Sequence, residues 1–423
     1  MRIITGKAAA ASVRKMAERA ACYTGVESAV KRIVADVRRH GDRALRKYAE
    51  RWDRLSPGQA LRVSEEDIDR AWASASAGLK TSLRTAAANI RRFCEVQKPK
   101  QWTRSRGGIS LGQIVRPLDS VGCYVPGGRH PLISTLLMTV IPAQVAGVET
   151  IRIVSPNVHL DVLAAAAMLG VRGVYRVGGA HSIAAMAYGT ESIPRVDKIV
   201  GPGNVYVTVA KKEVAFDCSI DFLAGPTEGL IVTDTGTPEF IAADLAAQAE
   251  HDPDAMAVFI TTKRDLADRV ARCVDAMAAG NAVARESLRK RGMILVSDSR
   301  QQSFDWANAI AAEHLTIDHK DIALVRNAGS IFIGDYSAQA AGDYASGPNH
   351  VLPTGGAARF RGGLSVTDFV KAISVQQVSS KGLRRIGPTI KTLAAAEGLR
   401  AHKNSIRIRC QRAFAGRARS SHA

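Results

Sequence analysis

Gln248 and His251 stand three residues apart in the segment AQAEHDP (residues 247–253), at the end of an Ala-rich run. If this run is helical, the i,i+3 spacing places both side chains on one face, where they could bind a metal ion together. The alternative is a solvated helix end, because polar residues are common on exposed surfaces. The segment taken alone favours the solvated surface, so the decision depends on the other polar groups of the chain.

Three further segments combine carboxylates with histidines. They are the pair Glu313-His314, the loop GDYASGPNHVLP (residues 342–353) with Asp343 and His350, and EGLRAHKN (residues 397–404) with Glu397 and His402. A Gln/His/Asp/His set offers nitrogen and oxygen ligands that suit Zn²⁺. Because Gln is neutral, the ion would keep much of its positive charge and could polarise a bound alcohol. Glu313 and His314 could supply general acid and base groups near neutral pH.

Each of these residues also has a purely structural explanation. His314 could end a helix, where the helix dipole favours a positive charge, and Asp343 and His350 could organise turns. His402 could be an ordinary surface histidine. Sequence spacing leaves both explanations open, because only the fold can bring such distant segments together or keep them apart.

The apolar pattern predicts the elements that must position these groups. Residues 1 to about 100 read as helices, with apolar residues at helical spacing in GVESAVKRIVADV (residues 25–37). Beyond about residue 115, short apolar strands alternate with Ala-rich helices. The expected strands are residues 121–125, 151–154, 174–177 and 198–200 in a first set, and 230–232, 257–260, 293–296 and 330–333 in a second. This alternation predicts parallel sheets with helices on both faces.

We therefore predict an α/β fold with two doubly wound, Rossmann-like units, a helical N-terminal segment and a small, mostly helical C-terminal tail domain. The predicted domains are residues 1–112, a helical region that partly packs on the second α/β unit, 113–230, the nucleotide-binding unit, 231–363, the metal and catalytic unit, and 364–423, the tail. Within the tail, SIRI (residues 405–408) is a candidate strand.

Three glycine-containing loops follow strands of the first set. They are Pro126-Gly127-Gly128-Arg129, Gly178-Gly179-Ala180 and Gly201-Pro202-Gly203-Asn204. Glycine at the C-terminal edge of such a sheet lets backbone N–H groups approach an anion at a helix N-terminus. Plain strand-to-helix turns explain each loop equally well, and Tyr206 stands where a full G-x-G-x-x-G motif would need its third glycine. Three such loops together favour a phosphate-bearing ligand.

Composition excludes several classes of protein. The chain has 423 residues, 46% hydrophobic and 23% charged, which is enough for a large core without disulfide or metal staples. The six cysteines form no C-x-x-C pair, which indicates reduced thiols in a cytoplasm. We read neither a signal peptide nor an apolar run of about 20 residues, so we expect no membrane partner.

The formal net charge of +19 is the least ordinary bulk property. We read the basic residues as spread along the chain, densest in residues 38–43 and 407–412, with no aromatic stacking motif beside them. This pattern favours a solvated basic surface that attracts anionic ligands over a nucleic-acid-binding function. We therefore expect no nucleic-acid partner.

Read in chain order, the motifs resemble the signature blocks of the histidinol dehydrogenase family. The blocks are VGCYVPGGR (121–129), DKIVGPGN (197–204), AGPTE (224–228), QAEH (248–251), EHL (313–315), GDYASGPNHVLPTGG (342–356) and EGLRAHKN (397–404). The resemblance spans nearly the whole chain, and QAEH and DYASGPNHVLPT are its most specific parts. It implies a homodimer with shared active sites that uses zinc and NAD to oxidise the small amino alcohol L-histidinol to L-histidine through L-histidinal. This oxidation would reduce two NAD⁺ and would be a step of histidine biosynthesis.

The same resemblance implies roles for single residues. The zinc ligands would be Gln248, His251, Asp343 and, from the tail of the partner subunit, His402. His314 would take the alcohol proton, and Glu313 would activate the water that attacks the aldehyde. Tyr124, His181 and Asn204 would contact NAD. Substrate would be held by Ser134, Thr227, His350 and the partner's Glu397, together with the zinc ligands and His314.

Two positions depart from the family pattern. His181 stands where the family usually has Gln, and Thr227 stands where it usually has Ser. Threonine keeps the hydroxyl but adds a methyl group, which could narrow the pocket. The alternative is therefore a related zinc- and NAD-dependent dehydrogenase of another amino alcohol or small polar diol, and a basic binding protein without catalytic activity is a third possibility. Glu250 falls off the face shared by Gln248 and His251, so we leave it out of the catalytic set.

Overall fold

A computed structural model describes residues 1–19, 25–127 and 132–418, with side chains described up to residue 411. Gly128 and Arg129 of the first glycine loop therefore lie outside the described residues. The chain divides into two compact units. Unit 1 comprises residues 1–98 and 118–369, and unit 2 comprises residues 99–117 and 370–423.

The first sheet of unit 1 has five parallel strands in the order β6-β5-β4-β7-β8. Its strands are β4 (Ser120–Tyr124), β5 (Thr150–Val154), β6 (Gly173–Tyr175), β7 (Lys198–Val200) and β8 (Ser219–Ile220). The crossover helices are α5 (Ile133–Ala146), α6 (Leu160–Met168), α7 (Gly179–Tyr188) and α8 (Val205–Val214). The order reverses around β4, so the loops after β4 and β7 open at a switch point, where such sheets bind ligands.

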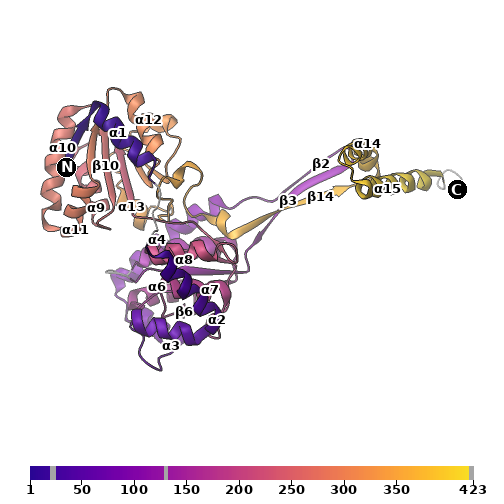
Figure 1. Ribbon diagram of the computed structural model, residues 1–423, viewed down its shortest axis with the longest axis horizontal. Helices are drawn as coiled ribbons and strands as arrows, with labels where there is room; N and C mark the ends of the chain where they lie inside the picture. Colours follow the sequence, from indigo (N-terminus) through magenta and orange to yellow (C-terminus); the bar gives the residue numbers. More distant parts are fainter. Residues whose placement is uncertain (20–24, 128–131, 419–423) are drawn as a thin grey trace. The chain divides into compact units, whose positions relative to one another are not determined.

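The second sheet of unit 1 has six parallel strands in the order β1-β11-β10-β9-β12-β13. Its strands are β1 (Arg2–Thr5), β9 (Glu228–Val232), β10 (Met256–Thr261), β11 (Met293–Val296), β12 (His314–Ile317) and β13 (Ser330–Ile333). Helices α1 (Gly6–Ala17) and α12 (Arg300–Ile310) pack on one face, and α9 (Pro238–Ala249), α10 (Arg264–Met277) and α11 (Ala282–Lys290) pack on the other (Figure 1). The predicted α/β fold with two Rossmann-like units is confirmed.

Short helical elements complete the second half of unit 1. They are α13 (Gln339–Tyr344) and the 3₁₀ helices η1 (Ala278–Gly280), η2 (His319–Leu324), η3 (Ala357–Arg359) and η4 (Val366–Phe369). The expectation that the first 100 residues are all helical is wrong at Arg2–Thr5. This segment is a strand because it pairs in parallel with β11 and extends the second sheet.

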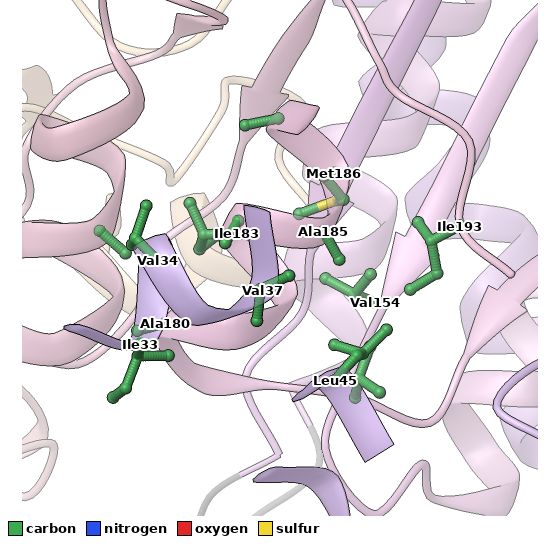
Figure 2. Packing of buried hydrophobic residues seen from close by; sticks show 14 of the residues in the cluster. Ile33, Val34, Val37, Leu45, Val154, Ala180, Ile183, Ala185, Met186 and Ile193 are labelled. Carbon is green, nitrogen blue, oxygen red and sulfur yellow. The ribbon is translucent and has the colours of Figure 1, made fainter. Parts of the chain in front are cut away.

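The remaining N-terminal helices pack against the helices that cover the first sheet. They are α2 (Glu27–Trp52), α3 (Glu65–Ser74) and α4 (Ala77–Gln97). Gly41, at φ +52, interrupts α2 with a non-helical bend, so the segments before and after it can both reach α7. Figure 2 shows Val34, Val37 and Leu45 of α2 in one apolar cluster with Ile183 and Ala185 of α7. Burial of such side chains contributes about 1.5–3 kcal/mol each and fixes the helix that carries His181.

Unit 2 is built from an antiparallel three-stranded sheet and two helices. The sheet has the order β14-β3-β2, with β2 (Trp102–Arg106), β3 (Ile109–Pro117) and β14 (Val370–Val378). The helices are α14 (Ser380–Ala396) and α15 (Arg400–Ala418). The sequence reading missed this sheet, because β14 is exposed over almost its whole length and lacks the apolar alternation of a half-buried strand.

The candidate strand SIRI is wrong, because residues 405–408 lie inside α15. Ile406 and Cys410 are one helical turn apart, and both side chains face Gly387 of α14. The apolar residues therefore follow the helical period rather than the period of a strand. The small Gly387 allows this close approach of the two helices.

The net charge is uneven between the two units, because acidic residues are nearly absent from unit 2. Unit 2 holds 16 of the 58 Lys and Arg residues but only one of the 39 acidic residues, Glu397, and so carries +15 of the formal charge of +19. The pattern was missed because two distant stretches, residues 99–117 and 370–423, form this unit together. The side chain of Glu397 can offset only one of the 16 positive charges in unit 2.

Candidate active site

A cavity of about 190 Å³ in unit 1 collects most of the predicted site residues. The predicted residues that line it are Ser134, Thr227, Gln248, His251, Glu313, His314, Asp343 and His350. These side chains come from five separate stretches of the chain, and Leu132, Pro202 and Phe222 of the first α/β half also line the cavity. The fold thus brings together groups that sequence spacing left undecided.

The two sheets contribute to the cavity from opposite strand ends. Ser134 and Pro202 follow β4 and β7, at the C-terminal edge of the first sheet, as predicted for a doubly wound fold. The second sheet contributes from its N-terminal edge, where Thr227 precedes β9 and His314 opens β12. Gln248 lies in the last turn of α9. The site residues of the second half therefore sit at the edge opposite to the one that the fold rule predicts.

Glu313 is a buried carboxyl group held by two donors. The Thr227 hydroxyl donates to its Oε2 over 2.7 Å, and the backbone N–H of Glu228 donates to the same oxygen over 3.0 Å. Only 7% of Glu313 is exposed. Burial raises the pKa of Glu313 to about 7, although His314 and the two donors act in the opposite direction. A carboxyl group with this pKa can take or give a proton near neutral pH.

His314 lies between two carboxylates. Its Nε2 is 3.3 Å from Oδ1 of Asp343, and its Nδ1 is 3.6 Å from Oε2 of Glu313. Burial alone would lower the pKa of His314, but the charge of Glu313 and the hydrogen bond to Asp343 outweigh burial and raise it. The two neighbouring acids therefore make this imidazole a stronger base than a free histidine.

Asp343 is surrounded by imidazoles. Burial would raise the pKa of Asp343, but the hydrogen bond to His314 and the charges of His314, His350 and His251 lower it below its usual value. His350 donates from Nδ1 to the backbone oxygen of Asp343 over 2.7 Å, which turns its Nε2 toward Thr135, 3.4 Å away. The carboxylate of Asp343 is thus kept ionised and available to a cation.

The predicted metal ligands of unit 1 line this same cavity. Gln248 is 2% exposed, and its Oε1 lies 3.0 Å from the Thr227 hydroxyl. His251 follows the end of α9 and is exposed, close enough to Asp343 for its charge to lower the pKa of that acid. Across the part of the chain that the structure describes, no three His, Cys, Asp or Glu side chains gather closely enough to hold a metal ion. An amide, an imidazole and a carboxylate fit the zinc donor set, and they leave room for a ligand from elsewhere.

Glu397 and His402 lie in unit 2. Glu397 caps the C-terminus of α14, and His402 lies in the first turn of α15. Both side chains are exposed. Each is therefore available on the surface of its unit rather than being used in its core.

His181 is enclosed within the first α/β half. It is 1% exposed, its Nε2 lies 2.7 Å from Oδ2 of Asp53, and its ring lies 5.8 Å from the rings of both Tyr48 and Trp52. Asp53 also accepts from the backbone N–H of Gly178 over 2.8 Å. The pair therefore fixes the Gly178-Gly179 turn at the start of α7. Sequence reasoning missed Asp53, which lies more than 100 residues away from His181.

The other two predicted nucleotide contacts also organise loops at this sheet edge. The Tyr124 hydroxyl accepts from the N–H of Gly179 over 3.3 Å, and burial raises the pKa of Tyr124 to about 12. Asn204 caps α8 by accepting from the N–H groups of Tyr206 and Val207, at 3.0 and 3.2 Å. Its side chain stays exposed at the helix N-terminus, where an anion would bind.

A buried ion pair that sequence reasoning missed supports the third glycine loop. Asp221 accepts from the N–H of Gly201 over 2.8 Å, and the Lys211 ammonium group donates to the oxygen of Gly201 over 3.0 Å. Lys211 and Asp221 also form a salt bridge with each other, and both are almost fully buried. No sequence signal marks them, because they look like ordinary charges on a helix and after a strand.

Two global properties accompany the site. In the described parts of the chain, no helix combines the length and apolar character needed to cross a membrane. Cys94, Cys123, Cys218, Cys273 and Cys410 are all unpaired, and Cys22 lies outside the described residues.

Comparison with known proteins gives a consistent result. The family model described as histidinol dehydrogenase matches residues 16–410. The histidinol dehydrogenase of Methanothermobacter thermautotrophicus is 49% identical over 392 residues, which cover 89% of this chain and 92% of that protein. That of Methanosarcina mazei is 44% identical, covering 94% of this chain and 95% of that protein. The crystal structure of histidinol dehydrogenase from Elizabethkingia anophelis matches with a TM-score of 0.92 and 35% identity, covering 97% of this chain and 98% of that one.

Proposed function

The chain belongs to the histidinol dehydrogenase family, and from this premise we propose that it oxidises L-histidinol to L-histidine in histidine biosynthesis. The protein is an NAD-dependent oxidoreductase. The observation that carries the proposal is the single cavity that gathers Glu313, His314 and Asp343 with five further predicted residues. Conversion of an alcohol to an acid removes four electrons, so two NAD⁺ accept one hydride each.

We place zinc at Gln248, His251 and Asp343, with His402 of the partner subunit as the fourth ligand. Bound there, zinc would supply positive charge that polarises the substrate oxygen and favours loss of its proton. The lowered pKa of Asp343 supports this placement, because an ionised carboxylate is the form that binds a cation. A neutral Gln ligand would leave that positive charge largely undiminished.

His314 and Glu313 divide the proton transfers. In the first oxidation His314 takes the proton of the alcohol oxygen while hydride leaves the carbon that bears this oxygen, and L-histidinal forms. In the second, the oxygen of a water molecule bonds to the aldehyde carbon, its proton passes to Glu313, and hydride leaves the hydrated carbon. Thr227 and Glu228 both engage Oε2 of Glu313, so we assign this proton to Oε1.

Substrate and dinucleotide would bind on neighbouring parts of unit 1. Ser134, Thr227 and His350 line the cavity and would hold the substrate, with the partner's Glu397 as a carboxylate for its ammonium group. NAD would use the loops of Tyr124, His181 and Asn204. Since His181 is 1% exposed, we assign it to holding the Gly178-Gly179 turn through Asp53 rather than to a surface contact.

We propose a homodimer with shared active sites as the working form. Unit 1 offers three zinc ligands, whereas His402 and Glu397 are exposed in unit 2 and free of core packing. All five cysteines among the described residues are unpaired, which supports a location in a reducing cytoplasm.

The direct test is NADH formation from L-histidinol by the zinc-loaded protein, with two NADH expected per substrate consumed. Absence of turnover by protein shown to contain zinc would contradict the proposal. A second candidate substrate class, another amino alcohol or a small polar diol, is favoured by Thr227, whose extra methyl group narrows the cavity beside Glu313. A panel of such alcohols ranked by kcat/KM separates the two.

A further inference from the structure

Arg19 forms a two-pronged ion pair with Glu228 next to the proposed catalytic carboxyl group. Its Nε and Nη2 atoms each lie 2.6 Å from a different carboxylate oxygen of Glu228. The side chain of Arg19 is 20% exposed and that of Glu228 only 6%. A planar guanidinium that bonds both oxygens of a nearly buried carboxylate fixes its position and its plane.

The same guanidinium also holds the segment that leads into Glu313. Nη1 of Arg19 donates to the backbone oxygen of Ile310 over 2.8 Å. Ile310 is the last residue of α12, and Ala311 then adopts φ +51, so the chain turns sharply just before Glu313. Arg19 therefore ties the end of α12 to Glu228.

Glu228, which Arg19 holds in place, forms hydrogen bonds to two parts of the active site. Its backbone N–H donates to Oε2 of Glu313, and its neighbour Thr227 donates to the same oxygen. Its carboxylate oxygen Oε1 accepts from the N–H of Gly355 over 3.0 Å, in the loop that follows His350. Glu313 is thus held by the backbone N–H of a residue whose side-chain carboxylate is fixed by Arg19.

We infer that Arg19 is a positioning residue for the oxidation of the aldehyde, acting through Glu228 on the orientation of Glu313. The inference rests on the proposed function, in which Glu313 accepts a proton from the water that attacks L-histidinal. Arg19 touches neither substrate nor metal in this scheme. Reduction of L-histidinal by NADH needs no attacking water, so it should not depend on Arg19.

This difference between the two reactions gives the test. The main variant is Arg19→Met combined with Glu228→Gln, because Arg19→Met alone leaves an unpaired carboxylate in a nearly buried place and could prevent folding. We expect kcat for L-histidinal oxidation by NAD⁺ to fall at least about tenfold, since small misplacements of a catalytic group have effects of this size or larger. Reduction of L-histidinal by NADH, the KM for NAD⁺ and the bound zinc should stay within about twofold of the unmodified protein.

Arg359→Met is the matched control. Arg359 donates to the backbone oxygens of Ala17 in α1 and Ala309 in α12, and among the described residues it binds no carboxylate. It therefore joins the same two helices as Arg19 without holding Glu228. We expect this variant to lower the melting temperature but to leave the ratio of the oxidation rate to the reduction rate unchanged.

Arg19→Lys completes the series. Lysine keeps the charge but lacks the planar fork, so it should recover only part of the oxidation rate. The inference is wrong if the ratio of the two rates is unchanged in the double variant, or if Arg359→Met changes it equally. If the unmodified, zinc-loaded protein fails to oxidise L-histidinol, the proposed function itself is wrong. This result differs from those that contradict the role of Arg19, so the two can be told apart.

Discussion

The Thr227 hydroxyl donates to Oε2 of Glu313 over 2.7 Å, and this bond links the AGPTE segment to the Glu-His pair 86 residues later. The family usually has serine at this position, and threonine retains the donor. The added methyl group is therefore compatible with the role that the resemblance assigns to the hydroxyl, and it changes only the shape of the cavity wall.

Removal of this hydroxyl should slow the reaction. Thr227→Val keeps the shape but leaves Glu313 with the Glu228 N–H as its donor, and a hydrogen bond to a charged group contributes about 1.5–3 kcal/mol. We expect kcat for L-histidinol oxidation to fall about tenfold to a hundredfold in this variant. Thr227→Ser, which restores the hydroxyl, should stay within about threefold of the unmodified protein. Equal rates for the valine and serine variants would contradict the role of the bond.

Removal of zinc should abolish activity, and its ligands should be separable from their neighbours. A chelator should stop NADH formation and added Zn²⁺ should restore it. His251→Ala and Asp343→Ala should weaken zinc binding at least about tenfold, because even residues that only orient a ligand have effects of that size. Glu250→Ala is the matched control, since Glu250 lies between the proposed ligands Gln248 and His251 in sequence and its carboxylate contacts Asn281 instead. Zinc content and activity of this control should be unchanged.

Glu313 should make the metal-free protein less stable as pH rises. The pKa of its buried carboxyl group, about 7, lies above the 4.5 of an ordinary glutamate, so the folded state resists ionisation more than the unfolded chain does. The free energy of unfolding should therefore fall between about pH 4.5 and pH 7, by at most about 3 kcal/mol from this group. Urea denaturation at several pH values should show a weaker pH dependence in Glu313→Gln. Identical pH dependence in the two proteins would show that the group is not perturbed.

Mixing two inactive variants should restore activity if the sites are shared. In a dimer of His402→Ala with Glu313→Ala, one site receives Glu313 and the partner's His402 intact, and the other site loses both. With complete exchange at equal amounts, half of the dimers are mixed, so about a quarter of the unmodified activity should return. Mass spectrometry of intact dimers verifies the exchange. No recovery in a verified mixture would mean that each site is built from one chain.

The sequence by itself predicted the alternation of strands and helices in unit 1, but not strands β1 and β8. Eight short apolar strands alternate with Ala-rich helices, and such alternation admits few arrangements other than parallel sheets covered on both faces. The local apolar pattern did not predict β1, which is a strand because it pairs with the edge of β11. It also failed for unit 2, where exposed strands lack apolar alternation and where two distant stretches together gather a charge of +15.

Only the tertiary structure showed that the candidate site residues lie together. Sequence spacing could name Gln248, Glu313 and Asp343 as candidates, but for each residue taken alone a purely structural explanation was favoured. Folding places them around one cavity, and burial there moves the pKa of Glu313 to about 7. Supporting residues such as Arg19 carry no recognisable motif, because a single charge in a helix tail has no local signature. Their role follows from contacts across more than 200 residues of chain, which only the packed structure creates.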